Sequence, residues 1–132
     1  MYIAICDDMA DELKELKNLL DAWQAQHHVA VHCKYFRSGE ELIEAAEKER
    51  FTLYLLDIIM PGISGMSVAK EIRSFDKTAD IDFLTSSPGF AYESYGVGAL
   101  EYLLKPVNTK LLYPLLDRIY IKEIKPQDGF NI

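Results

Sequence analysis

Two short segments of the chain are apolar at every position, and they constrain the fold more than any other feature. Residues 2–6 (Tyr-Ile-Ala-Ile-Cys) and 53–56 (Leu-Tyr-Leu-Leu) lack the alternation that a half-exposed strand shows. A continuous apolar run of this length is typical of a strand covered on both faces, as in a parallel sheet. The sequence therefore predicts a sheet with helices packed on both sides.

Strand and helix patterns alternate along the 132 residues. We expect strands over 2–6, 29–36, 51–56, 80–84 and 100–104, and helices over 9–26, 38–47, the segment after Ser64, 88–95 and 108–124. Alternation of this kind predicts parallel strands joined by right-handed helical crossovers. The predicted fold class is α/β, a single doubly wound (βα)5 flavodoxin-like domain with a five-stranded parallel sheet of order 2-1-3-4-5.

Local signals mark several helix ends. Ser38 and Glu41 form a capping-box pattern, and Ser64 is placed to cap the next helix. An acid also suits a helix N-terminus, so we expect Asp8 to help cap the first helix. Pro114 lies inside the last expected helix and removes a backbone donor there, so that helix either kinks or begins later than residue 108.

Composition excludes several function classes. The net charge of −7 argues against binding nucleic acid by neutralising its phosphates. The two cysteines, Cys6 and Cys33, do not have a metal-binding spacing. No apolar run approaches the ~20 residues of a membrane span, and no signal peptide is evident. We expect a cytoplasmic protein that does not enter a membrane.

Polar side chains follow four of the expected strands. Asp7 and Asp8 come after the first, Asp57 ends the third, Thr85 the fourth and Lys105 the fifth. The carboxyl ends of parallel strands meet at one edge of the sheet, and ligands of doubly wound folds bind where the winding reverses, here between strands 1 and 3. Carboxylates, a hydroxyl and an amine at that edge suggest a Mg²⁺-dependent site that accepts a phosphoryl group.

The same residues, in the same order, resemble the receiver domain of bacterial two-component response regulators. The matching segments are Asp7-Asp8, Asp57 to Gly65, Thr85-Ser86 and Lys105-Pro106, and the resemblance covers about residues 1–124. Residues 90–107 are most similar to receivers that precede a LytTR-type DNA-binding domain.

The resemblance implies a role for each acid. Asp57 is the phosphoacceptor, and it binds Mg²⁺ directly together with Asp8. Asp7 acts on the metal ion through water, and the backbone carbonyl of Ile59 is a further ligand. Three neighbouring carboxylates are also hard to keep ionised without a cation, which agrees with a metal site.

The resemblance also implies how the phosphoryl group is held and sensed. The Lys105 ammonium and the Thr85 hydroxyl contact the phosphoryl oxygens. Thr85 then moves inward and Tyr102 rotates into the space that it leaves. A cis bond between Lys105 and Pro106 is implied as well.

The implied protein is a switch and not an enzyme, although it assists its own phosphorylation and dephosphorylation. Its partners would be a sensor histidine kinase and a second copy of the chain, joined through the face of the last helix and strand. Residues 1–124 would form the receiver domain, and 125–132 a linker or the start of a missing C-terminal output domain. DNA would be bound only through that output domain; an ordinary frayed terminus is the alternative for residues 125–132.

Two other functions fit parts of the pattern. A phosphatase of the haloacid-dehalogenase type also uses Asp, Mg²⁺, Thr or Ser, and Lys, but it needs an Asp-x-Asp motif after the first strand. A flavodoxin-like electron carrier needs a Ser/Thr/Gly-rich phosphate loop, where this chain has Asp-Asp-Met-Ala-Asp-Glu. The histidines His27, His28 and His32 show no ligand geometry, and we expect surface or loop positions for them.

Overall fold

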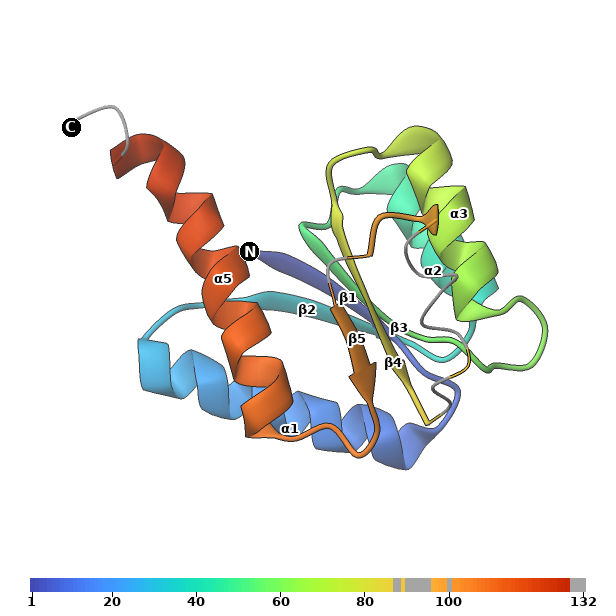
Figure 1. The fold of residues 1–132 in the computed structure, drawn as a ribbon, viewed down its shortest axis with the longest axis horizontal. Coiled ribbons are helices and arrows are strands. Elements are labelled where there is room, and N and C mark those ends of the chain that lie inside the picture. The colour runs from blue at the N-terminus through green and yellow to red at the C-terminus, as the bar shows by residue number, and fades with distance from the viewer. Residues whose placement is uncertain (87–88, 90–95, 100, 129–132) are drawn as a thin grey trace.

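The computed structural model describes residues 1–86, 89, 96–99 and 101–128, with side chains described as far as Ile124. Five parallel strands form one sheet in the order β2-β1-β3-β4-β5. Helices α1 and α5 lie on one side of the sheet, and α2 and α3 on the other (Figure 1). The elements are β1 (Tyr2–Cys6), α1 (Ala10–His27), β2 (His32–Phe36), α2 (Gly39–Lys48), β3 (Leu53–Asp57), α3 (Gly65–Phe75), β4 (Asp80–Thr85), β5 (Glu101–Leu104) and α5 (Thr109–Asp128).

The predicted fold class and strand order are confirmed. Both apolar runs occupy the middle of the sheet, where β1 pairs with β2 and β3, and β3 pairs with β1 and β4. Burial on both faces explains why they carry no polar position. The helix expected over 88–95 lies outside the described residues except for Gly89.

The sheet separates two apolar cores. Side chains of β1, β3 and β4 that point toward α2 and α3 pack with Leu42, Val68 and Ile72. Alternate side chains of the same strands point toward α1 and α5 and pack with Trp23, Leu112 and Leu116. None of the helices in the described ranges is long and apolar enough to cross a membrane.

The second strand begins three residues later than expected, at His32 instead of residue 29. The end of α1 explains the difference. His28 adopts the left-handed conformation with φ 53°, and the Val29 amide donates to the Gln24 carbonyl at 3.2 Å. The Gln24 side chain then accepts from the Val31 amide at 2.9 Å. Residues 28–31 therefore close the helix before pairing with β1 can start.

Helix starts agree with the capping pattern in two of three cases. The hydroxyls of Ser38 and Ser64 each accept a bond from the amide three residues on. The expectation that Asp8 caps α1 is wrong, because the N-cap residue is Met9 and makes no side-chain cap. Asp7 instead accepts from the Met9 amide at 2.9 Å, so the acid one residue earlier fixes this turn.

The last helix does not begin after Pro114. Asn108 accepts from the Leu111 and Leu112 amides, and α5 starts at Thr109 and continues through Pro114 as one helix to Asp128. Residues 125–128, which we expected to belong to a linker, are helical.

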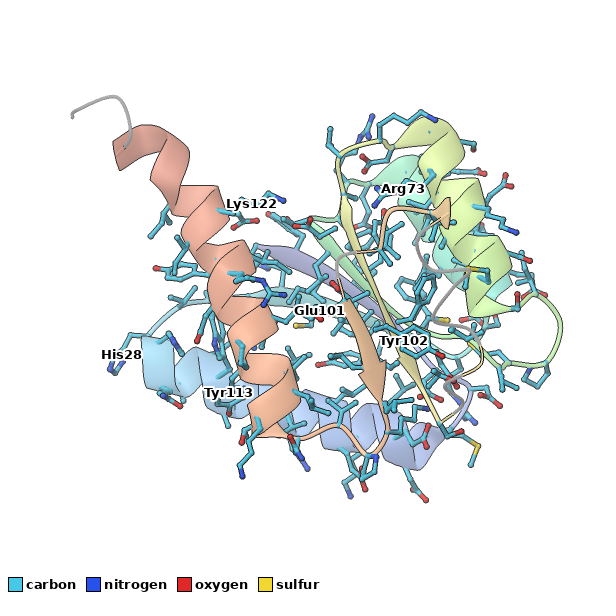
Figure 2. All side chains as sticks on the ribbon, in the orientation of Figure 1. His28, Arg73, Glu101, Tyr102, Tyr113 and Lys122 are labelled. Atoms are coloured by element: carbon cyan, nitrogen blue, oxygen red, sulfur yellow. The ribbon has the colours of Figure 1, made fainter. Side chains whose placement is uncertain are left out.

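One arginine of α3 binds the segment that leads into β5. The Arg73 guanidinium donates to the carbonyls of Val97 at 2.8 Å, Ala79 at 2.6 Å and Gly98 at 3.3 Å. Figure 2 shows Arg73 extending from α3 on the side of the sheet opposite α1 and α5. It therefore joins α3, the turn before β4 and the approach to β5.

Candidate functional site

Two buried acids lie side by side at the C-terminal edge of the central strands. Asp7 directly follows β1, and Asp57 is the last residue of β3. The strands are neighbours, with Cys6 opposite Leu56, so the next residue of each comes to the same edge. Asp7 is 0% exposed and Asp57 is 5% exposed. Burying two carboxylates is unfavourable unless a cation or hydrogen bonds stabilise them.

The start of α3 packs directly on the backbone of Asp57. The Gly65 amide donates to the Ile58 carbonyl at 2.9 Å. A Cβ atom at position 65 would lie 1.9 Å from the Asp57 carbonyl oxygen, so only glycine fits there. This close approach fixes the loop between β3 and α3 beside the acids.

Lys105 brings positive charge to the same edge. Its amide donates to the Thr85 carbonyl at 2.8 Å, which extends the pairing of β4 and β5 by one residue, and its bond to Pro106 is cis. The Lys105 ammonium lies 2.7 Å from Asp7 and 3.4 Å from Asp57. One cation therefore contacts both buried acids.

The third acid of the site is Glu12, which is not one of the site residues expected from the sequence. Glu12 is the third residue of α1 and also forms an ion pair with the Lys105 ammonium. One carboxylate oxygen each of Asp7, Glu12 and Asp57 lies within 4.8 Å of the other two. The signal was an acid in the first turn of the helix that directly follows the acid pair, since this turn faces the same edge.

The protonation properties reflect crowded negative charge. Burial raises the pKa of Asp57 to about 6, and the charges of Asp7 and Asp8 add to this, while Lys105 opposes it. Burial and the neighbouring Glu12 carboxylate also raise the pKa of Asp7. Burial alone would lower the pKa of Lys105, but its bonds to Asp7 and Glu12 and the charge of Asp57 raise it above its ordinary value. Lys105 is therefore an ammonium ion, and it does not fully offset the negative charge.

Asp8 stands apart from this group of three carboxylates. It is partly buried, and its backbone carbonyl accepts from Arg37 at 3.0 Å. Its charge still acts on Asp57, whose pKa it raises. Ile59 lies two residues after Asp57 and is 56% exposed. Because its side chain is apolar, only its backbone offers polar atoms.

Thr85 and Tyr102 lie on the neighbouring strands β4 and β5. Thr85 ends β4, is 0% exposed and is opposite Leu104 of β5. Tyr102 is opposite Phe83 and packs against the core under α2 and α3. Figure 2 shows Tyr102 on the side of the sheet that faces α2 and α3.

The histidines do not form a metal site. His27 lies 3.2 Å from Asp117, His32 stacks on Tyr2, and His28 ends α1. Within the described part of the chain, Asp7, Glu12 and Asp57 are the one group of such residues close enough to share a metal ion.

A cavity of about 260 Å³ adjoins the acids. Lys105, Glu12 and Asp7 line its polar end, and Glu15 together with apolar side chains of α1, β4 and the segment after β5 lines the rest. The site is therefore open on the side where α1 and the residues after Lys105 meet.

Comparison with known proteins gives a consistent result. The family described as the response regulator receiver domain matches residues 3–117. The sensory transduction protein LytT of Oceanobacillus iheyensis is 34% identical over 90% of this chain and 48% of its own length. The positive alginate biosynthesis regulatory protein of Pseudomonas aeruginosa is 30% identical over 89% of this chain and 46% of its own length.

A solved structure agrees in fold and in part of the sequence. The response regulator protein TrrA from Thermotoga maritima, in complex with Mg²⁺ and BeF, superposes with a TM-score of 0.78 at 30% identity, covering 89% of this chain and 97% of that one. The chain spans about half the length of the two curated relatives that it matches. The chain belongs to the family of response regulator receiver domains, which act as phosphoacceptor switches and not as classical enzymes.

Proposed function

We propose that Asp57 accepts a phosphoryl group from a sensor histidine kinase and that the modified site controls an output. The single observation that carries this proposal is the position of the Asp57 carboxylate, at the end of the central strand with an ammonium ion 3.4 Å away. In the transfer, an Asp57 oxygen bonds to phosphorus while the bond between phosphorus and the kinase histidine nitrogen breaks. The product is an acyl phosphate.

The donor set fits Mg²⁺, because hard divalent ions prefer carboxylate oxygens and the site carries more negative charge than Lys105 offsets. The residues that would hold the ion are Asp7, Asp8, Asp57 and the carbonyl of Ile59. When bound, the metal ion would supply positive charge to the phosphoryl oxygens. Support for this also comes from TrrA, whose structure is a complex with Mg²⁺ and BeF.

The remaining polar groups would bind the phosphoryl group and transmit its presence. The Lys105 ammonium would offset the new negative charge, and the Thr85 hydroxyl would donate a hydrogen bond to it. Thr85 lies one strand from Asp57, and Tyr102 lies on the next strand. An inward movement of Thr85 followed by rotation of Tyr102 would change the face of β5 that partners meet.

We further propose that the output is transcription through a LytTR-type DNA-binding domain following residues 125–132. The similarity to LytT supports this, as does the length of the relatives, which is about twice what the chain covers. The chain itself would not bind DNA or a membrane. It would work in the cytoplasm, and a second copy would join it through the face of α5 and β5.

Phosphorylation with a small donor such as acetyl phosphate tests the proposal. With Mg²⁺ present, mass spectrometry should find one phosphoryl group on the wild-type chain and none on Asp57→Asn. Asp21→Asn is the matched control, because Asp21 is exposed on α1 and pairs only with Lys17 within the described residues. Equal modification of Asp57→Asn and wild type would refute the assignment, and steady release of phosphate from small esters would favour a phosphatase.

A further inference from the structure

The Lys105 ammonium is held on the α1 side of the site. It forms ion pairs with Glu12 and, at 2.7 Å, with Asp7, whereas Asp57 is 3.4 Å away. Its side chain is 14% exposed, so few water molecules reach it. To bind a phosphoryl group on Asp57 closely, the ammonium must move toward Asp57 and loosen one of the other two contacts.

The two competing partners differ in how easily they can release the ammonium. Asp7 is 0% exposed and accepts the Met9 amide as well, so it is fixed in place. The Glu12 side chain is 38% exposed and lies at the mouth of the cavity beside Lys105. Water can solvate a Glu12 carboxylate that has lost its partner, whereas a buried Asp7 carboxylate left unpaired would be strongly destabilised. Glu12 is therefore the contact that gives way.

The position of the ammonium also separates Glu12 from the metal. Oxygens of Asp7, Glu12 and Asp57 are close enough to share an ion, but the Lys105 ammonium already contacts all three. A divalent ion at that centre would lie against a like charge at short range, which is unfavourable. Glu12 therefore serves the lysine, and the acids left to hold a metal ion would be Asp7, Asp8 and Asp57.

We propose that Glu12 is a displaceable counter-ion that holds Lys105 back from Asp57 and releases it when Asp57 carries a phosphoryl group. This inference rests on the proposed function of Asp57. Glu12 acts through Lys105 and is a positioning residue. By stabilising the retracted ammonium it slows phosphorylation and weakens binding of a phosphoryl group.

Glu12→Gln removes the charge and keeps the shape of the side chain. Glu15→Gln is the matched control, since Glu15 lies one turn further along α1, lines the same cavity and is exposed. Both variants change the net charge equally, so any general effect on an anionic donor appears in both. The difference between them isolates the contact with Lys105.

The first measurement is NMR of the Lys105 ammonium in protein with ¹⁵N-labelled lysine side chains, without metal. Glu12→Gln should speed hydrogen exchange of the ammonium and shift its nitrogen resonance, and Glu15→Gln should leave both as in wild type. The second is the rate of phosphorylation by acetyl phosphate with Mg²⁺, which should rise about fivefold in Glu12→Gln relative to Glu15→Gln, the order expected for a partly exposed ion pair.

Mg²⁺ binding in the Lys105→Met background tests the rival role as a metal ligand. The proposal requires that Glu12→Gln and Glu15→Gln then have equal Mg²⁺ affinity. A selective loss of affinity in Glu12→Gln would make Glu12 a ligand and overturn the proposal, as would identical ammonium spectra or identical phosphorylation rates for the two variants. A wild-type chain that is not phosphorylated at all would instead refute the proposed function, while the NMR comparison would still decide the contact.

Discussion

Replacing Asp82 with asparagine should change how the stability of the protein depends on pH. Asp82 is 0% exposed in the middle of β4, between Leu55 of β3 and Glu101 of β5. Its side chain faces the layer of α1 and α5, as that of Leu84 does two residues on. Within the described residues no hydrogen bond of ordinary geometry reaches either carboxylate oxygen, and the Glu101 amide is only close enough to act weakly.

The folded protein therefore keeps Asp82 protonated. Burial raises its pKa from 3.8 to about 8, and the Glu101 amide opposes this only in part. In the unfolded chain the group ionises near its ordinary pKa, so the unfolded state binds fewer protons between these values and stability falls as pH rises through that window. From acid pH, where both states are protonated, to neutral pH, ionisation of Asp82 in the unfolded chain lowers the free energy of unfolding by roughly 4 kcal/mol.

Chemical denaturation followed by circular dichroism measures this effect. Between about pH 5.5 and about pH 7.5, the wild-type chain should lose roughly 2.5 kcal/mol more stability than Asp82→Asn, whose amide does not ionise. The buffer should contain no divalent metal ion, because the ion would bind the two other acids whose pKa values are raised. Asp7 and Asp57 also make the free energy of unfolding fall as pH rises. Both are present in wild type and in Asp82→Asn, so their contributions cancel in the comparison.

Asp21→Asn is the control, because Asp21 is exposed on α1 and pairs with Lys17, whereas a change at Asp80 would itself alter the pKa of Asp82. Its unfolding free energy should differ from wild type by a constant amount across the window. Parallel curves for wild type and Asp82→Asn would refute the reasoning, since they would mean that Asp82 is ionised in the fold.

Two further substitutions test the packing around the site. Gly65→Ala should lower the free energy of unfolding by about 3 kcal/mol in urea titrations and slow phosphorylation, because its Cβ would displace the backbone of Asp57; unchanged values would contradict the close approach. Arg73→Met keeps much of the apolar stem but loses the bonds to Val97 and Ala79, so we expect a loss of about 2 kcal/mol and faster amide exchange before β5, measured by hydrogen exchange. Exchange that is unchanged there, or equally faster throughout the chain, would show that Arg73 does not anchor that segment.

The strand order could be predicted because each signal is local and agrees with the others. Residues 2–6 and 53–56 are apolar throughout, Ser38 and Ser64 start helices, and the connections are too short for many topologies. The proximity of Asp7, Asp57 and Lys105 followed from the rule that parallel strands present their carboxyl ends at one edge.

Other features depend on side-chain contacts that the strand and helix patterns do not specify by themselves. Glu12 reaches the site because the first turn of α1 faces Lys105, which is 93 residues away in the chain. The late start of β2 depends on the Gln24 side chain bonding to Val31. The burial of Asp82 could not be predicted, because its strand contains both polar and apolar residues and the burial depends on how the α1–α5 layer covers β4.

The sheet that divides the interior has a consequence for how the protein can change. Val68 and Leu116 belong to different layers, and the strands that lie between those layers keep their side chains from sharing neighbours. Substitutions on opposite sides should therefore combine additively, because distant sites without shared partners rarely couple. Evolution or an engineer could reshape the α2–α3 exterior for a new recognition task while the α1–α5 half stays as it is.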